Sequence, residues 1–260
     1  YYSRMERKTL EAMMEAITAA LPTFHSYLKR KAELLGHKGG LPWYDLFAPL
    51  NIAQKAAKKY TVEEAKEYVL KHFAPFAKDL TAMIEAAFAC EWIDFYPRKG
   101  KVGGAFCANL PFIKQSRVLT NYDGELGDIV TLAHELGHAY HGLMIEDHRI
   151  LNTNYSMPVA ETASTFNENI IMNAAITEEN DPLQRLILIE KQLQDLTQII
   201  CDIYSRYIFE RNVFEKRKNS FMFAGELCDM MREAQQEAYG DALDHNCLHP
   251  YMWINKSHYY

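Results

Sequence analysis

The sequence predicts a mainly α-helical fold that carries one small β-hairpin or sheet. Apolar residues recur at helical spacing over residues 5–20, where Ala, Leu, Met and Glu are frequent. The same pattern covers most of residues 126–239. Residues 99–121 differ, because glycines, short apolar runs and β-branched residues gather there, as is typical of strands and turns. No repeat or low-complexity segment is visible, so we expect a single domain over residues 1–260.

Local signals give the boundaries of the first expected helices. Pro22 favours the start of a second helix, which should run towards residue 35. Thr61, followed three residues later by Glu64, is typical of a capping box and predicts a helix to about residue 72. Pro75 permits a further start, and that helix should run to about residue 92.

Composition argues against several classes of protein. With 48% hydrophobic and 24% charged residues, the 260-residue chain can bury a large core. Its net charge is -6 and its basic clusters are short, so we expect no nucleic-acid partner. It has no run of 18 apolar residues, so we expect no membrane span. Five widely spaced cysteines without a C-x-x-C pattern favour a reducing compartment, and we expect a cytoplasmic location.

The pentapeptide HELGH at positions 134–138 matches the H-E-x-x-H pattern. We expect it on a helix over about residues 126–147, where His134 and His138 would share one face and reach the same ion. Imidazole nitrogen is a preferred zinc ligand. Glu135 would flank that face and act on water as general base. The pattern therefore predicts one Zn²⁺, in preference to two core histidines beside a surface glutamate.

A catalytic zinc site needs a third protein ligand and one open position. The extended pattern H-E-x-x-H-x-x-G-x-x-H fails here, because His141 and Met144 stand where Gly and His are needed. The carboxylates at positions 146 and 147 follow His138 too closely to fold back onto the metal. Glu161 lies 23 residues after His138, at the start of the next helical stretch, and is the predicted third ligand.

Two further residues are predicted to support the ligands. Glu168 lies seven residues beyond Glu161, on the same helical face, and we expect it to hydrogen-bond to a ligand histidine. The alternative is an ordinary surface carboxylate. His141 shares the face of His138, and we expect a supporting role there and not metal binding.

The segment LAHELGHAYH at 132–141, followed by PVAETAS at 158–164, resembles the M3 family of zinc oligopeptidases. It is more similar to oligoendopeptidase F and its relatives than to thimet oligopeptidase and neurolysin. DFYPRKGK at 94–101 and GGAF at 103–106 look like the family's strand before the catalytic helix. The resemblance implies a multi-helix, zincin-type peptidase domain with a small sheet beside the active-site helix.

The resemblance also implies an activity, namely the hydrolysis of short peptides by a zinc-dependent endopeptidase. It gives His134, His138 and Glu161 the role of metal ligands and Glu135 that of the base. Zinc would activate water, and Glu135 would move its proton.

Substrate contacts are implied at two places. The strand with Gly103, Gly104 and Ala105 would border the cleft and pair with the substrate backbone, which gives binding independent of side chains. His258 matches the family's substrate-binding histidine and would stabilise the oxyanion.

The chain also departs from the family pattern. The family's carbonyl-polarising tyrosines would follow position 260, and its N-terminal helical region is largely absent, so we expect a catalytic-domain fragment. Two alternatives stay open. One is a zinc metallocarboxypeptidase of related helical fold, and the other is an inactive peptide-binding fragment. The sequence does not predict the cleavage-site preference, the physiological peptides or the oligomeric state.

Overall fold

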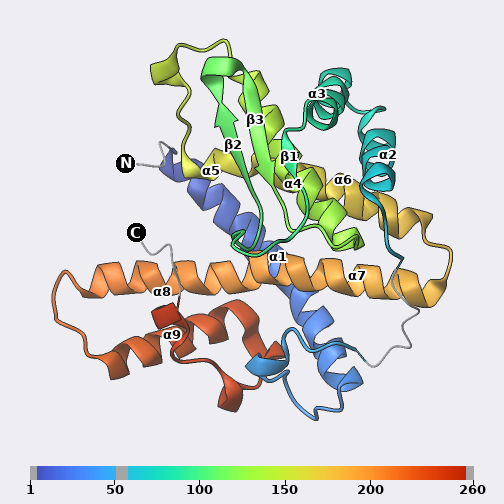
Figure 1. Cartoon of the computed structure of the whole chain (residues 1–260). Coiled ribbons are helices and arrows are strands. Elements are labelled where there is room, and N and C mark those ends of the chain that lie inside the picture. The colour runs from blue at the N-terminus through green and yellow to red at the C-terminus, as the bar shows by residue number, and fades with distance from the viewer. Residues whose placement is uncertain (1–4, 51–57, 256–260) are drawn as a thin grey trace. The chain divides into compact units, whose positions relative to one another are not determined.

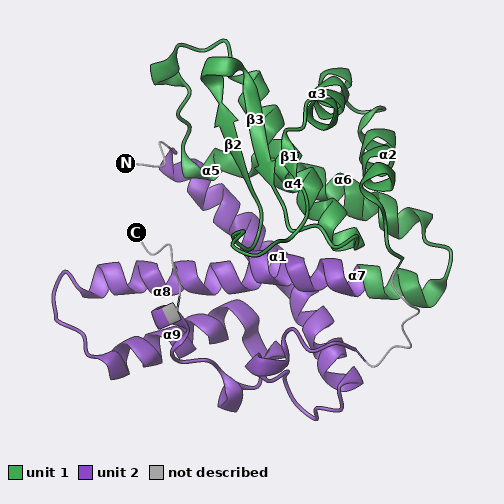
Figure 2. Cartoon of the chain, in the orientation of Figure 1, with its two compact units in different colours: residues 1–4, 54–188 green, residues 5–53, 189–260 purple. Residues whose placement is uncertain are grey.

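The computed structural model describes residues 5–50 and 58–255 (Figure 1). The chain divides into two compact units, each with a core of its own (Figure 2). Unit 1 comprises residues 1–4 and 54–188, and unit 2 comprises residues 5–53 and 189–260. The expected single domain stays a prediction. Among the described residues, no helix combines the length and the apolar character needed to cross a membrane.

Unit 1 contains a three-stranded sheet with the order β1-β3-β2. β1 (Ile93–Asp94) runs parallel to β3 (Gln115–Leu119), and β2 (Phe106–Leu110) pairs antiparallel with β3. The turn between β2 and β3 ends at Lys114, which has a φ of 51°. Within the described chain, β3 is the only strand paired with β2, whose other edge is therefore free. The predicted mainly helical fold with a small sheet is confirmed.

The helices of unit 1 follow the local signals closely. α2 (Val62–Phe73) begins with the predicted capping box, because Thr61 Oγ1 accepts from the Glu64 N–H at 3.1 Å and the Glu64 carboxylate accepts from the Thr61 N–H at 2.8 Å. α3 (Lys78–Ala89) is shorter at both ends than expected. The other helices of the unit are α4 (Leu126–Met144), α5 (Met157–Ala160), α6 (Thr162–Glu178) and the first part of α7 (Pro182–Thr197).

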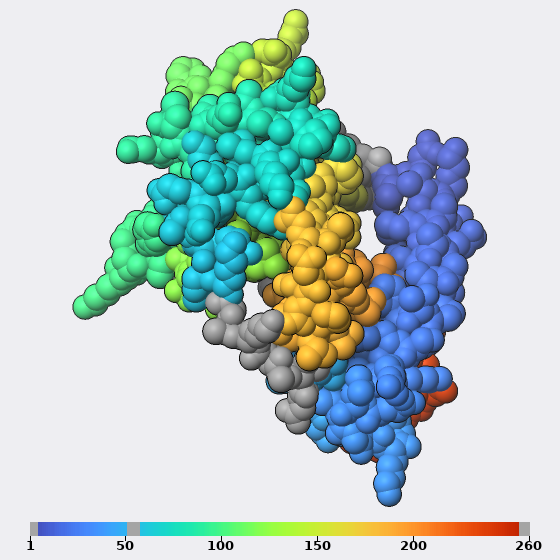
Figure 3. All heavy atoms as spheres, turned by 90° about the vertical axis from the view of Figure 1, so that its right-hand side faces the viewer, coloured from blue at the N-terminus to red at the C-terminus, as the bar shows by residue number. Residues whose placement is uncertain are grey.

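The core of unit 1 is built around α4. Its apolar residues Ile129, Leu132 and Leu136 are fully buried against the sheet, α2, α3 and α6. α2 lies beside α6 in the space-filling view (Figure 3), and Lys71 and Glu178 form an ion pair between them at 2.5 Å. The central helix of the unit is thus held on several sides.

Unit 2 is helical, with α1 (Arg7–Leu34), the rest of α7, α8 (Ile203–Lys216) and α9 (Ala224–Tyr239). A π-helical segment, Gln198–Asp202, joins α7 to α8. The expected break at Pro22 is wrong, because α1 continues through it. A proline inside a helix costs about 3 kcal/mol, but α1 buries Leu21, Phe24 and Leu28 in the core of unit 2, and this packing outweighs the cost.

Lys31 is a buried cation in unit 2, only 1% exposed. Its ammonium donates to Leu46 O at 2.9 Å, and to Glu190 Oε1 and Gln194 Oε1 at 2.8 Å each. All three donors of the group are used, and the Glu190 carboxylate compensates its charge. Glu190 also accepts from the Tyr27 hydroxyl at 2.8 Å, so the buried pair belongs to a network.

Lys31→Ala should therefore lower the free energy of unfolding by about 3–5 kcal/mol, because it leaves the Glu190 charge without its partner. The matched control is Lys29→Ala, since the Lys29–Asp241 pair is exposed and should contribute less than about 1 kcal/mol. Urea denaturation of both variants measures the difference. Equal losses would contradict this role for Lys31.

Candidate metal centre

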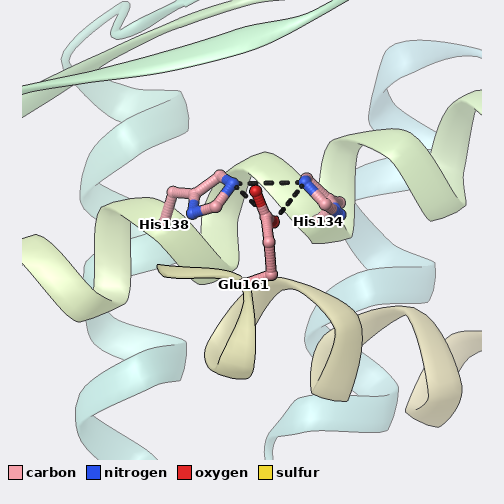
Figure 4. Close-up of side chains that lie close together, drawn as sticks. All are labelled: His134, His138 and Glu161. Carbon is pink, nitrogen blue, oxygen red and sulfur yellow. Dashed lines mark hydrogen bonds and ion pairs between the residues drawn. The ribbon is translucent and has the colours of Figure 1, made fainter. Parts of the chain in front are cut away.

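Three side chains with metal-binding atoms converge beside α4 (Figure 4). His134 and His138 come from successive turns of α4, and Glu161 lies at the junction of α5 and α6. The two Nε2 atoms are 3.1 Å apart, and Glu161 Oε2 lies 3.3 Å from each. The structure thus brings together the three residues that the sequence predicts as ligands.

The geometry of this group fits a tetrahedral metal ion. Bonds of about 2.0–2.1 Å to zinc place tetrahedral ligand atoms about 3.3–3.4 Å apart. The three observed separations, 3.1, 3.3 and 3.3 Å, are close to this value. Two imidazole nitrogens with one carboxylate oxygen also form a donor set that zinc accepts, and three protein ligands leave one position open.

Glu161 reaches the histidines because α4 and α6 pack closely at Gly137. A Cβ atom on Gly137 would lie 2.6 Å from Ser164 Cα and 2.7 Å from Ala163 O, which is too close for any other residue. A hydrogen bond from Asn167 Nδ2 to Ala133 O, at 3.1 Å, fixes the same contact. The backbone spacing of the two helices therefore depends on the glycine of the HELGH pentapeptide.

The Glu161 carboxylate is also oriented locally. The Ser164 hydroxyl donates to Glu161 Oε2 at 2.6 Å, the same oxygen that faces both imidazoles. Ser164 is fully buried, whereas the Glu161 side chain is half-exposed, so the hydrogen bond anchors the carboxylate from the buried side.

Glu168 contacts the ring of His134 as expected, through a hydrogen bond between the carboxylate and Nδ1. This contact leaves Nε2 of His134 facing His138 and Glu161. Burial lowers the pKa of His134, but Glu168, aided by the charges of Glu135 and Glu161, outweighs it and the net pKa is raised. The contact therefore fixes both the ring orientation and the tautomer.

Burial shifts the pKa values of His138 and Glu135, the other two titratable residues of the pentapeptide, in opposite directions. Burial lowers the pKa of His138 against the opposing charge of Glu161, with further lowering by His134 and His141, and the net lowering favours the neutral imidazole that a metal needs. Glu135 is only 5% exposed, and burial raises the pKa of its carboxyl against the opposing effect of His134. A buried carboxylate one residue from a metal-facing imidazole can accept a proton in a water-poor environment.

His141 lies outside the converging group. Its ring stacks on that of Tyr155, with centroids 4.1 Å apart and an interplanar angle of 27°. Because Tyr155 lies between α4 and α5, this stacking packs the connection against the face of α4 that carries His141. The supporting role expected for His141 stays a prediction.

Gly103, Gly104 and Ala105 lie before β2 and not within it. Asn121 Nδ2 donates to Val102 O at 3.0 Å and to Gly104 O at 2.9 Å, which folds this segment into a loop with a Gly104 φ of 78°. A Cβ atom on either glycine would meet no atom within 4 Å, so the loop is open on that side. Their expected substrate contacts remain a prediction, and His258 lies outside the described residues.

Asn109 on β2 is a supporting residue that the sequence does not reveal. Its Nδ2 donates to the His138 carbonyl at 3.3 Å, and its Oδ1 accepts from the Ser116 hydroxyl at 2.8 Å. A Cβ atom on Gly142 would lie 2.5 Å from Asn109 Oδ1, so this glycine makes room for the amide. The alternation of exposed and inward-facing residues along β2 could have indicated that Asn109 faces inward. It could not have identified the His138 carbonyl as its hydrogen-bond partner.

The contact at Gly137 generates a testable prediction. Gly137→Ala should lower the free energy of unfolding by about 1–3 kcal/mol, because the added methyl overpacks the contact between α4 and α6. It should also weaken metal binding, since Glu161 moves with α6. Gly225→Ala is the control, because that position on α9 is open and the change should be neutral or slightly stabilising. Unaltered thermal stability and metal affinity in Gly137→Ala would refute the constraint.

Comparisons of structure support the fold. A protein of known structure from Chlamydophila abortus superimposes with a TM-score of 0.81 at 21% identity, covering 100% of this chain and 44% of that one. Oligoendopeptidase-F from Enterococcus faecium gives a TM-score of 0.62 at 20% identity, covering 98% and 39%. At these identities the likeness concerns the fold alone.

Comparisons of sequence extend this to the family. An oligoendopeptidase F homolog of Lactococcus lactis is 28% identical over 256 residues, which cover 97% of this chain and 42% of that protein. Oligopeptidase PepF of Bacillus subtilis is 27% identical over 250 residues, which cover 95% and 37%. The chain thus spans about two fifths of the length of these relatives. A sequence model of peptidase family M3 matches residues 3–260, so the chain belongs to that family, as its motifs indicate.

Proposed function

We propose that this chain carries the active site of a zinc-dependent endopeptidase that hydrolyses short peptides. The observation that carries the proposal is the convergence of His134, His138 and Glu161 beside a buried Glu135. Such a set supplies three ligands, an open position and a base, which are the parts that metal-assisted hydrolysis needs. The relatives named as oligopeptidases support the choice of short peptides.

A zinc ion held by these three side chains would polarise the peptide carbonyl and lower the pKa of water at the site. Glu135 accepts the proton of the attacking water and then donates it to the leaving amine. Glu168 holds the His134 ring so that Nε2 faces inward, and Ser164 holds the carboxylate of Glu161. His258 is proposed to stabilise the oxyanion.

The free edge of β2 offers a place for the peptide backbone. Main-chain hydrogen bonds along a strand edge bind peptides independently of their side chains. The loop with Gly103, Gly104 and Ala105 leads into this edge and is proposed to contact the substrate as well. Asn109, on the same strand, is hydrogen-bonded to the His138 carbonyl, which fixes β2 relative to α4. A peptide paired with β2 would therefore lie at a fixed distance from the metal site.

The cytoplasm is the proposed location. All five cysteines are free thiols, namely Cys90, Cys107, Cys201, Cys228 and Cys247. Free thiols are typical of proteins in reducing compartments.

Loss of one ligand should abolish metal binding. His134→Ala and Glu161→Ala should each reduce zinc to well below one ion per chain, because two remaining ligands do not define a tetrahedral site. Glu168→Ala should lower the zinc affinity only about 10–100-fold, the usual cost of losing a hydrogen bond to a ligand. Metal analysis after dialysis measures this, with the exposed His148→Ala as control. Full zinc content in Glu161→Ala would exclude Glu161 as a ligand.

Glu135→Gln should keep the zinc but lower turnover about 10²–10⁴-fold, because the amide cannot accept a proton. Glu85→Gln, an exposed change on α3, serves as control. Peptides blocked at both ends are the substrates, since an endopeptidase cleaves them and a carboxypeptidase requires a free terminus. Cleavage of free peptides alone would favour the carboxypeptidase alternative, and metal-bound protein without turnover would favour a peptide-binding role.

A further inference from the structure

A cavity of about 340 Å³ opens in unit 1 beside the C-terminal half of α4. Four apolar residues of its lining, which we call the floor, are Met83, Trp92, Ala139 and Leu143. Its walls come from β2, the turn before β3, and the connection between α4 and α5, which lies near the tip of the hairpin in Figure 1. A volume of this size lies within the range of cavities that bind small molecules or side chains.

Two lining residues of the cavity adjoin His138, one of the proposed metal ligands. Ala139 directly follows His138 on α4. Asn109 donates to the His138 carbonyl at 3.3 Å. β2, the strand proposed to hold the substrate backbone, also lines the cavity through Cys107, Asn109 and Leu110, so a peptide bound along this strand would pass beside it.

The chemistry of the lining favours an uncharged occupant. The floor is apolar, and the two charged lining residues, Lys114 and Glu146, face each other at 3.5 Å. Lys114 also pairs with Asp147 at 2.7 Å. A charged side chain would lose its hydration, and both charged lining residues already have a partner of opposite charge, whereas an apolar side chain gains contact with the apolar lining.

We infer that this cavity is a specificity pocket that receives one apolar or aromatic side chain of the peptide substrate. The inference rests on the proposed peptidase function and adds to it a class of preferred residue. The hairpin turn and the α4–α5 connection, in particular Thr153, set the size of the pocket.

The test compares blocked peptides that differ at a single position, which holds Ala, Phe, Asp or Lys. That position is moved along the peptide on both sides of the cleaved bond. The wild-type protein should prefer Phe over Ala at one position by about 10–100-fold in kcat/KM, and should reject Asp and Lys there. Thr153→Trp should bring the Phe-to-Ala ratio of kcat/KM at that position close to one, because the indole fills the pocket.

The control variant is Thr177→Trp on α6. Both threonines donate to a main-chain carbonyl, Thr153 to Ile150 at 2.8 Å and Thr177 to Asn173 at 2.7 Å, but only Thr153 lines the cavity. Thr177→Trp should keep the preference for Phe. Leu143→Ala, which deepens the floor, should shift the preference from Phe towards Trp and gives a second test if Thr153→Trp is unstable.

Binding separates this inference from the proposed function. The dissociation constants of the same peptides are measured by fluorescence anisotropy on Glu135→Gln protein, where no turnover is needed. If wild-type protein cleaves none of the peptides, the proposed function fails, and the Phe-to-Ala ratio in binding still decides the pocket. An unchanged ratio in Thr153→Trp, or equal losses for both peptides, would overturn the inference.

Discussion

The close approach of α4 and α6 at Gly137 is the contact on which the proposed site depends. The two histidines are fixed to each other by helical spacing alone, but Glu161 belongs to a segment 23 residues further along. It comes within 3.3 Å of both imidazoles because no side chain separates the helices at Gly137. Since a Cβ there would lie 2.6 Å from Ser164 Cα, glycine is a geometric requirement of the site.

Hydrogen bonds from α6 and β2 then fix the residues of the site. Glu168 holds one imidazole from α6, and Ser164 holds the carboxylate oxygen that faces both rings. Asn109 connects β2 to the carbonyl of His138. This hydrogen bond fixes the distance between the free edge of β2 and the metal site. A peptidase needs this spacing, because the substrate backbone and the reacting carbonyl must be positioned by separate elements.

Features that depend on neighbouring residues could be predicted from the sequence. The pentapeptide on a helix and the capping box at Thr61 follow from local spacing. Glu161 was predicted from its place at the start of the next helical stretch, but the packing at Gly137 that brings it to the histidines is not a local feature. Pro22 was misleading, because burial of one face of α1 outweighs the local cost of proline. The strand expected at Gly103, Gly104 and Ala105 begins later, at Phe106. The hydrogen bond from Asn121 to the Gly104 carbonyl holds the preceding residues in a loop. Asn109 could not be found, because its partner His138 is 29 residues away and the contact depends on how the sheet packs on α4.

X-ray absorption spectroscopy at the zinc edge of the metal-loaded protein tests the central claim most directly. The account predicts one zinc per chain, with two imidazole nitrogens and carboxylate or water oxygens at about 2.0–2.2 Å, and a spectrum without sulfur. A sulfur shell at about 2.3 Å, or a single imidazole, would contradict a site made by His134, His138 and Glu161.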